Sequence, residues 1–121
     1  HWNVQGHSFF QLHAVFEGYY EGVAKSLDEV AERILTLGAR PYASMKEYLE
    51  NATLKELESK GLSGDEAIDV LEGDFLAMLK DSRELLSTAE DAKDQGTVDL
   101  MGGFIGEYEK ALWMIKASKV K

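Results

Sequence analysis

The chain has 121 residues, 45% of them hydrophobic, which suits one domain with a sizeable core. It contains no cysteine, which excludes disulfides, thiolate metal sites and cysteine nucleophiles. Its 22 acidic and 13 basic side chains give a net charge of −9, which repels nucleic acid and anionic membranes and attracts cations.

The first six residues, from His1 to Gly6, are too few to form an element of their own. The chain opens on histidine rather than methionine, which suggests that a preceding segment is missing. No apolar run approaches the roughly 20 residues of a membrane span, and no signal segment is present. We therefore expect a cytoplasmic protein without a membrane anchor.

The next stretch, from His7 to Gly38, predicts one long amphipathic helix, because apolar residues recur in it at helical spacing. Gly38 and Pro41 should end this helix. Its apolar positions are Phe9, Leu12, Phe16, Tyr19, Tyr20, Val23, Leu27, Val30, Ala31 and Ile34.

The same helix carries a second, polar stripe. At 100° per residue, its members lie within about 100° of arc, but Glu17 and Asp28 are roughly 16 Å apart along the axis. One chain therefore cannot gather the whole stripe at one site. The members are His13, Glu17, Asp28 and Glu32.

The stripe is symmetric about the point midway between Gly22 and Val23. An antiparallel copy crossing there would place His13 opposite Glu32, and Glu17 opposite Asp28. Such a two-fold dimer, the commonest oligomer, would contain two sites, each built from both chains. Glycine near the crossing would permit close backbone approach. The alternative interpretation of the stripe is a solvated polar face.

A connector follows the long helix. Ser44–Glu47 and Thr53–Glu56 both have capping-box spacing, so we expect short helical turns between Ser44 and Glu58. The run from Lys60 to Leu62 should be a break. No segment carries a strand pattern.

Two further long helices are predicted. A third capping box, Ser63–Glu66, opens the first of them, which should end near Gln95–Gly96. The last helix should run from Thr97 to about Ala117 and bury Leu100, Met101, Phe104, Ile105, Tyr108, Leu112 and Ile115. Because bundles with inward polar sites usually have four helices, we expect the missing first helix to precede His1.

The sequence resembles the Dps family of mini-ferritins over essentially its whole length. The resemblance is carried by the pattern His1-Trp2-Asn3-Val4-x-Gly6-x-x-Phe9-Phe10-x-Leu12-His13, by the run from Asp28 to Arg33, and by the run from Leu112 to Ala117. It implies one all-α domain spanning residues 1–121: a ferritin-like four-helix bundle with a short helix in its long connector, here apparently without its first helix. It also implies two-fold dimers that assemble into a hollow dodecamer.

The resemblance also implies a function. Ferrous iron would be oxidised by hydrogen peroxide at ferroxidase centres between subunits, and the ferric product would be stored inside the shell. One chain would supply His1, His13 and Glu17 as metal ligands, and its partner would supply Asp28 and Glu32. The position of Glu17 is often Asp in the family, so contact through water is an alternative to direct ligation.

Several other residues carry open interpretations. Trp2 would absorb stray oxidising equivalents beside the centre, or would be an ordinary packing residue. His7 is expected at a surface or interface, and Trp113 in the core or an interface. The acids Asp91, Asp94 and Asp99 would line a cation pore or, as we prefer, mark a solvated helix end.

The sequence also bears on three other functions. A nucleoid DNA-binding and DNA-protecting protein with secondary iron binding is the main alternative, but the net charge of −9 argues against DNA binding. A di-iron site within a single bundle, as in bacterioferritins or rubrerythrins, needs histidines later in the chain, and none follows His13. A helical scaffold without metal is the third.

Overall fold

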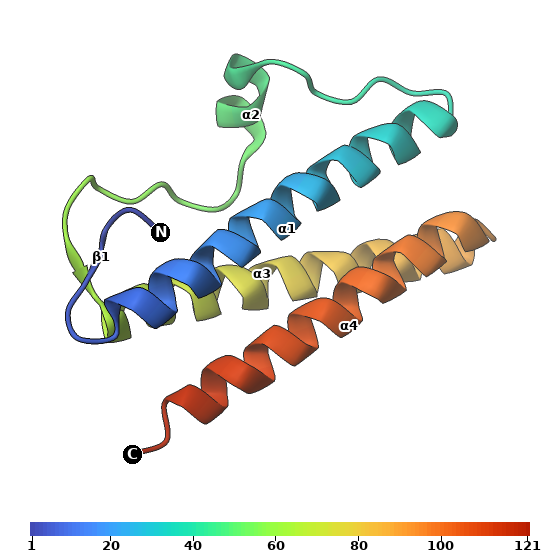
Figure 1. The fold of residues 1–121 in the computed structure, drawn as a ribbon. Helices are drawn as coiled ribbons and strands as arrows, with labels where there is room; N and C mark the ends of the chain where they lie inside the picture. Colours follow the sequence, from blue (N-terminus) through green and yellow to red (C-terminus); the bar gives the residue numbers. More distant parts are fainter. The chain divides into compact units, whose positions relative to one another are not determined.

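A computed structural model describes all residues from 1 to 121. The elements in chain order are β1 (Val4–Gln5), α1 (Phe9–Thr36), α2 (Met45–Asn51), β2 (Leu62–Ser63), α3 (Gly64–Asp91) and α4 (Gln95–Ser118) (Figure 1). They divide into two compact units, residues 1–64 and 65–121. No helix combines the length and apolar character that a membrane crossing requires.

The long helix α1 confirms the prediction for residues 7–38, with two residues fewer at each end. It ends in a Schellman motif, in which Gly38 has a φ of +86° and the Ala39 N–H donates to the Ile34 carbonyl oxygen at 3.1 Å. Glycine is suited to this left-handed position because it has no Cβ. The helix is therefore continuous through every residue of the polar stripe.

The structure corrects the expectation that the chain contains no strand. β1 and β2 pair in parallel, with Val4 opposite Leu62 and Gln5 opposite Ser63. Strands of two residues are too short to show the alternation on which a sequence prediction depends.

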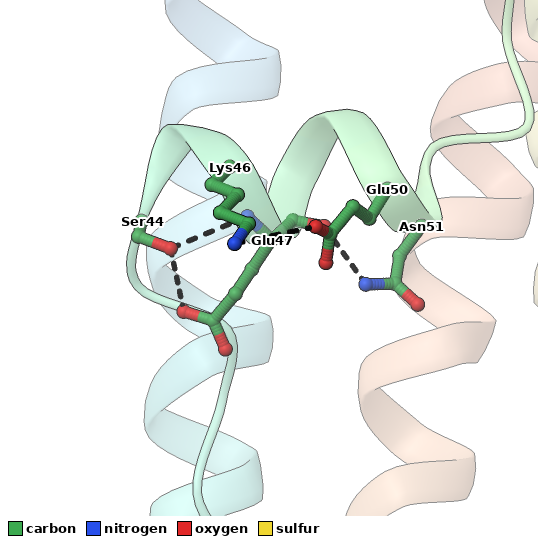
Figure 2. Close-up of polar contacts among 5 residues, drawn as sticks. All are labelled: Ser44, Lys46, Glu47, Glu50 and Asn51. Atoms are coloured by element: carbon green, nitrogen blue, oxygen red, sulfur yellow. Dashed lines mark hydrogen bonds and ion pairs between the residues drawn. The ribbon is translucent and has the colours of Figure 1, made fainter.

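The connector forms one of the two predicted helical turns. The Ser44 hydroxyl accepts from the Glu47 N–H at 3.2 Å and donates to the Glu47 carboxylate at 2.8 Å, which opens α2 (Figure 2). The bond from Ser44 lowers the pKa of Glu47. The prediction for Thr53–Glu56 is wrong, since no helix forms there. Capping-box spacing alone is not enough, because forming the first turn of a helix is unfavourable.

In the second unit, α3 and α4 form an antiparallel pair. Residues buried on α4 recur at alternating steps of four and three, which confirms the predicted apolar face except that Ala111 is buried more deeply than Leu112. Phe75 on α3 meets Tyr108 on α4 with ring centroids 5.5 Å apart. Lys119 pairs with Asp69 at 2.7 Å and also with Glu72, which ties the end of α4 to α3.

The break between these two helices lies at residues 92–94, earlier than the predicted Gln95–Gly96. Lys93 takes a left-handed conformation with a φ of 56°, and the Asp94 carboxylate caps α4 by accepting from the Thr97 N–H at 3.2 Å. Because Asp94 caps it, α4 begins at Gln95, and Gly96 is its second residue.

Candidate metal centre

Two of the predicted ligands, His1 and His13, lie face to face in the first unit. Their ring centroids are 3.8 Å apart and their planes differ by 19°. His1 Nδ1 lies 2.8 Å from the His13 carbonyl oxygen, and His13 Nδ1 lies 3.0 Å from the His1 carbonyl oxygen. This reciprocal pair holds the N-terminal segment against α1.

The two hydrogen bonds fix which nitrogen of each ring is available. A carbonyl oxygen can only accept, so both Nδ1 atoms must donate and carry a proton. In a neutral imidazole, Nε2 then keeps its lone pair. Metal-binding histidines are commonly oriented in this way, with one ring nitrogen donating to a carbonyl group. Nε2 is thus the nitrogen of each ring that is available to an external partner.

Two aromatic side chains support the histidine pair. Phe9 stacks on His13 with centroids 4.9 Å apart, and Tyr20 meets the edge of His1 at 5.1 Å. Desolvation, together with the negative charges of Glu17 and Glu21, raises the pKa of the Tyr20 phenol. The sequence placed Phe9 and Tyr20 on the apolar stripe but did not predict these contacts, because they depend on the path of the N-terminal segment.

The three carboxylates of the stripe, Glu17, Asp28 and Glu32, are exposed on α1. Glu17 lies one helical turn after His13, whereas Asp28 lies roughly 16 Å further along the continuous helix. No group of three or more histidine and acidic side chains within the chain is placed to hold a metal ion. The structure therefore brings the two histidines together but does not bring Asp28 and Glu32 to them within one chain.

The aromatic and histidine residues with open interpretations are all exposed. Trp2 is 91% exposed although it follows His1 directly. His7 lies on the surface, outside the histidine pair. Trp113 is 64% exposed, so it is not part of the core of this chain.

The acids near the end of α3 have local contacts. Asp94 caps α4 through the Thr97 N–H and also accepts from the Thr97 hydroxyl. Asp99 accepts from Gln95 Nε2 at 2.7 Å. These bonds are typical of a helix end, which is the interpretation preferred from the sequence.

Comparison with known proteins identifies the class. The sequence matches the ferritin-like domain family over residues 1–119. DNA protection during starvation protein 2 of Bacillus anthracis is 38% identical over 117 residues, which cover 97% of this chain and 80% of that protein. DNA protection during starvation protein of Porphyromonas gingivalis is 40% identical over 121 residues, covering 100% of this chain and 76% of that protein.

The structural comparison agrees. The crystal structure of the Dps protein from Vibrio cholerae O1 matches with a TM-score of 0.91 and 42% identity, covering 96% of this chain and 72% of that one. The fold is therefore that of the ferritin-like proteins, and the predicted all-α, ferritin-like four-helix class is confirmed. Within that class, the chain belongs to the Dps family.

Proposed function

We propose that this protein stores and detoxifies iron: it oxidises Fe(II) with hydrogen peroxide at centres shared by two subunits and keeps the ferric product inside a hollow dodecamer. The observation that carries the proposal is the histidine pair, whose two Nε2 atoms are free to bind a metal at one end of α1. Imidazole and carboxylate ligands suit Fe(II), and carboxylates also accommodate the harder Fe(III).

The missing half of each centre would come from an antiparallel copy of α1. In that arrangement Glu32 of the partner faces His13, and Asp28 of the partner faces Glu17. The three carboxylates of the polar stripe are exposed and His13 is half-buried, which leaves the stripe available to a second chain. Gly18 and Gly22, near the proposed axis, have no atom within 4 Å of an added Cβ, so nothing in this chain requires glycine there.

An apolar pair extends the same symmetry. Phe10 is 84% exposed and Leu35 is 50% exposed, although both are large hydrophobic residues on α1. They are equidistant from the point midway between Gly22 and Val23. Phe10 precedes Asp28 by five full turns, and Leu35 follows Glu17 by five, so both lie on the face of the stripe. In the proposed dimer, Phe10 of each chain would cover Leu35 of the other chain, on the outer side of each set of metal ligands.

The chemistry uses iron as substrate. Two ferrous ions would each give one electron to a single peroxide molecule, whose O–O bond breaks to yield two hydroxide ions. Because peroxide accepts both electrons at one place, no hydroxyl radical is released. Hydrolysis of the ferric ions then releases protons and forms the mineral.

The residues would have distinct roles. His1 and His13 would hold iron in one subunit, and Asp28 and Glu32 of the partner would complete the site, with Glu32 able to bridge two ions. Glu17 would bind directly or through water. Trp2, exposed beside His1, would give one electron and one proton to any stray hydroxyl radical, which becomes water.

The charge of the chain supports iron over DNA as the partner. A net charge of −9 raises the local concentration of Fe(II) and opposes the phosphate contacts on which DNA affinity depends. We therefore expect no DNA binding, and we propose a cytoplasmic location for the shell.

Disulfide cross-linking tests the dimer. The chain has no cysteine, so the variant carrying both Phe10→Cys and Leu35→Cys has only the introduced thiols. We expect mild oxidation to convert most of it into covalent dimers on a non-reducing gel. In the proposed arrangement each Cys faces the other position of the partner, within the short range that a disulfide requires.

The single variants are the controls. Two copies of position 10 would lie roughly 38 Å apart across the proposed axis, so Phe10→Cys alone should remain uncross-linked. The proposed pairing is wrong if the single variant dimerises as readily as the double variant, or if the double variant forms no covalent dimer.

A further inference from the structure

His1 lies in the segment before α1, so the helical backbone of α1 does not fix its position. Gly6, with a φ of +108°, turns the chain between this segment and α1. A turn at glycine is a natural hinge, because glycine has few conformational restrictions. Without further support, the segment that carries His1 would be held only by the contacts of His1 with His13 and Tyr20.

The strand pair provides that support. The Leu62 N–H donates to the Asn3 carbonyl oxygen at 2.8 Å, and β2 runs beside β1 in parallel. Val4, at the centre of the segment, is only 2% exposed. A Cβ at Gly61 would collide with Gln5 Oε1, so the Gln5 side chain covers Gly61 closely. The segment is thus held at Asn3, Val4 and Gln5, two to four residues after His1.

We infer that the β1–β2 pair holds His1 in its metal-binding position, which makes Leu62 a positioning residue of the metal centre. The inference rests on the proposed function, because it takes His1 to be a ligand. Leu62 acts through its backbone N–H, which anchors Asn3 two residues after His1. Supporting groups outside the ligand shell typically change metal affinity 10- to 100-fold when they are removed.

The test is a pair of proline variants measured with Co(II), which binds histidine and carboxylate sites but is not oxidised in air. Leu62→Pro removes the N–H that bonds to Asn3. Leu57→Pro makes the same change in the irregular, exposed part of the connector, outside both strands. By calorimetry, we expect Leu62→Pro to weaken Co(II) binding at least about 10-fold, and Leu57→Pro to change it less than about twofold.

A double-mutant cycle separates positioning from a general loss of structure. If Leu62 acts only through His1, Leu62→Pro should have no further effect on Co(II) affinity in a His1→Ala background. A further loss in that background would overturn the inference. If His1→Ala alone leaves Co(II) binding unchanged, the ligand assignment of the proposed function fails instead. If His1→Ala weakens binding and Leu62→Pro does not, only the positioning inference fails.

A second variant covers the case in which Leu62→Pro does not fold. Val4→Ala keeps the backbone hydrogen bonds of β1 but truncates the buried Val4 side chain. It should also weaken Co(II) binding in the parent and have no effect in the His1→Ala background. Unchanged binding in Val4→Ala, with unchanged helical content, would count against the role of the strand pair.

Discussion

Mixing equal amounts of His13→Ala and Asp28→Ala subunits should restore about one quarter of the parent rate of Fe(II) oxidation by peroxide, although each variant alone is inactive. The reason is the sharing of each centre. In a mixed dimer, one site combines the intact His13 of one chain with the intact Asp28 of the other, and the second site lacks both. Random pairing makes half of all dimers mixed, and half of their sites are complete.

Each variant alone should oxidise Fe(II) at least about 100-fold more slowly than the parent, because a lost ligand costs more than the 10- to 100-fold of a supporting group. The measurement is the initial rate of Fe(III) absorbance after peroxide is added to subunits that were unfolded together and refolded. Helical content by circular dichroism should match the parent. His7→Ala is the matched control, since His7 is exposed and lies outside the histidine pair.

A site within one chain would give a different result. Neither variant could then rescue the other, and the mixture would remain inactive at every ratio. Full activity of either single variant would remove His13 or Asp28 from the ligand set.

Local sequence features predicted most of the fold. Helix α1 follows from apolar periodicity with a glycine at its end, and α2 from the capping box of Ser44 and Glu47. The strand pair could not be predicted, because Val4 and Leu62 are 58 positions apart and each strand has two residues. The break before α4 was misplaced because the Asp94 cap outweighs the helix-breaking tendency of Gly96.

The candidate site, too, could be predicted only in part from the sequence. The face shared by His13, Glu17 and the later acids follows from helical spacing alone. The stacking of His1 on His13 and the two hydrogen bonds that fix their tautomers do not, because they depend on how β2 holds the segment before α1. Sequence patterns thus indicated which side chains could bind metal, and the tertiary contacts show which nitrogen of each histidine is free.

Met101→Ala should be the most destabilising truncation of a methionine on α4. Met101 is 4% exposed and Met114 is 50% exposed, so the same substitution removes a buried side chain at one position and a half-exposed one at the other. Burial predicts a loss of about 2–5 kcal/mol in the free energy of unfolding for Met101→Ala. Met114→Ala should change it by less than about 0.5 kcal/mol.

Thermal unfolding monitored by circular dichroism checks this difference, with an expected fall of about 10 °C in the midpoint for Met101→Ala. The measurement should be repeated at several protein concentrations, because association with other subunits stabilises a folded chain by mass action. A loss in Met114→Ala that grows with protein concentration would mean that subunit contacts cover Met114. Equal losses in both variants at every concentration would mean that burial along α4 is not what stabilises this helix.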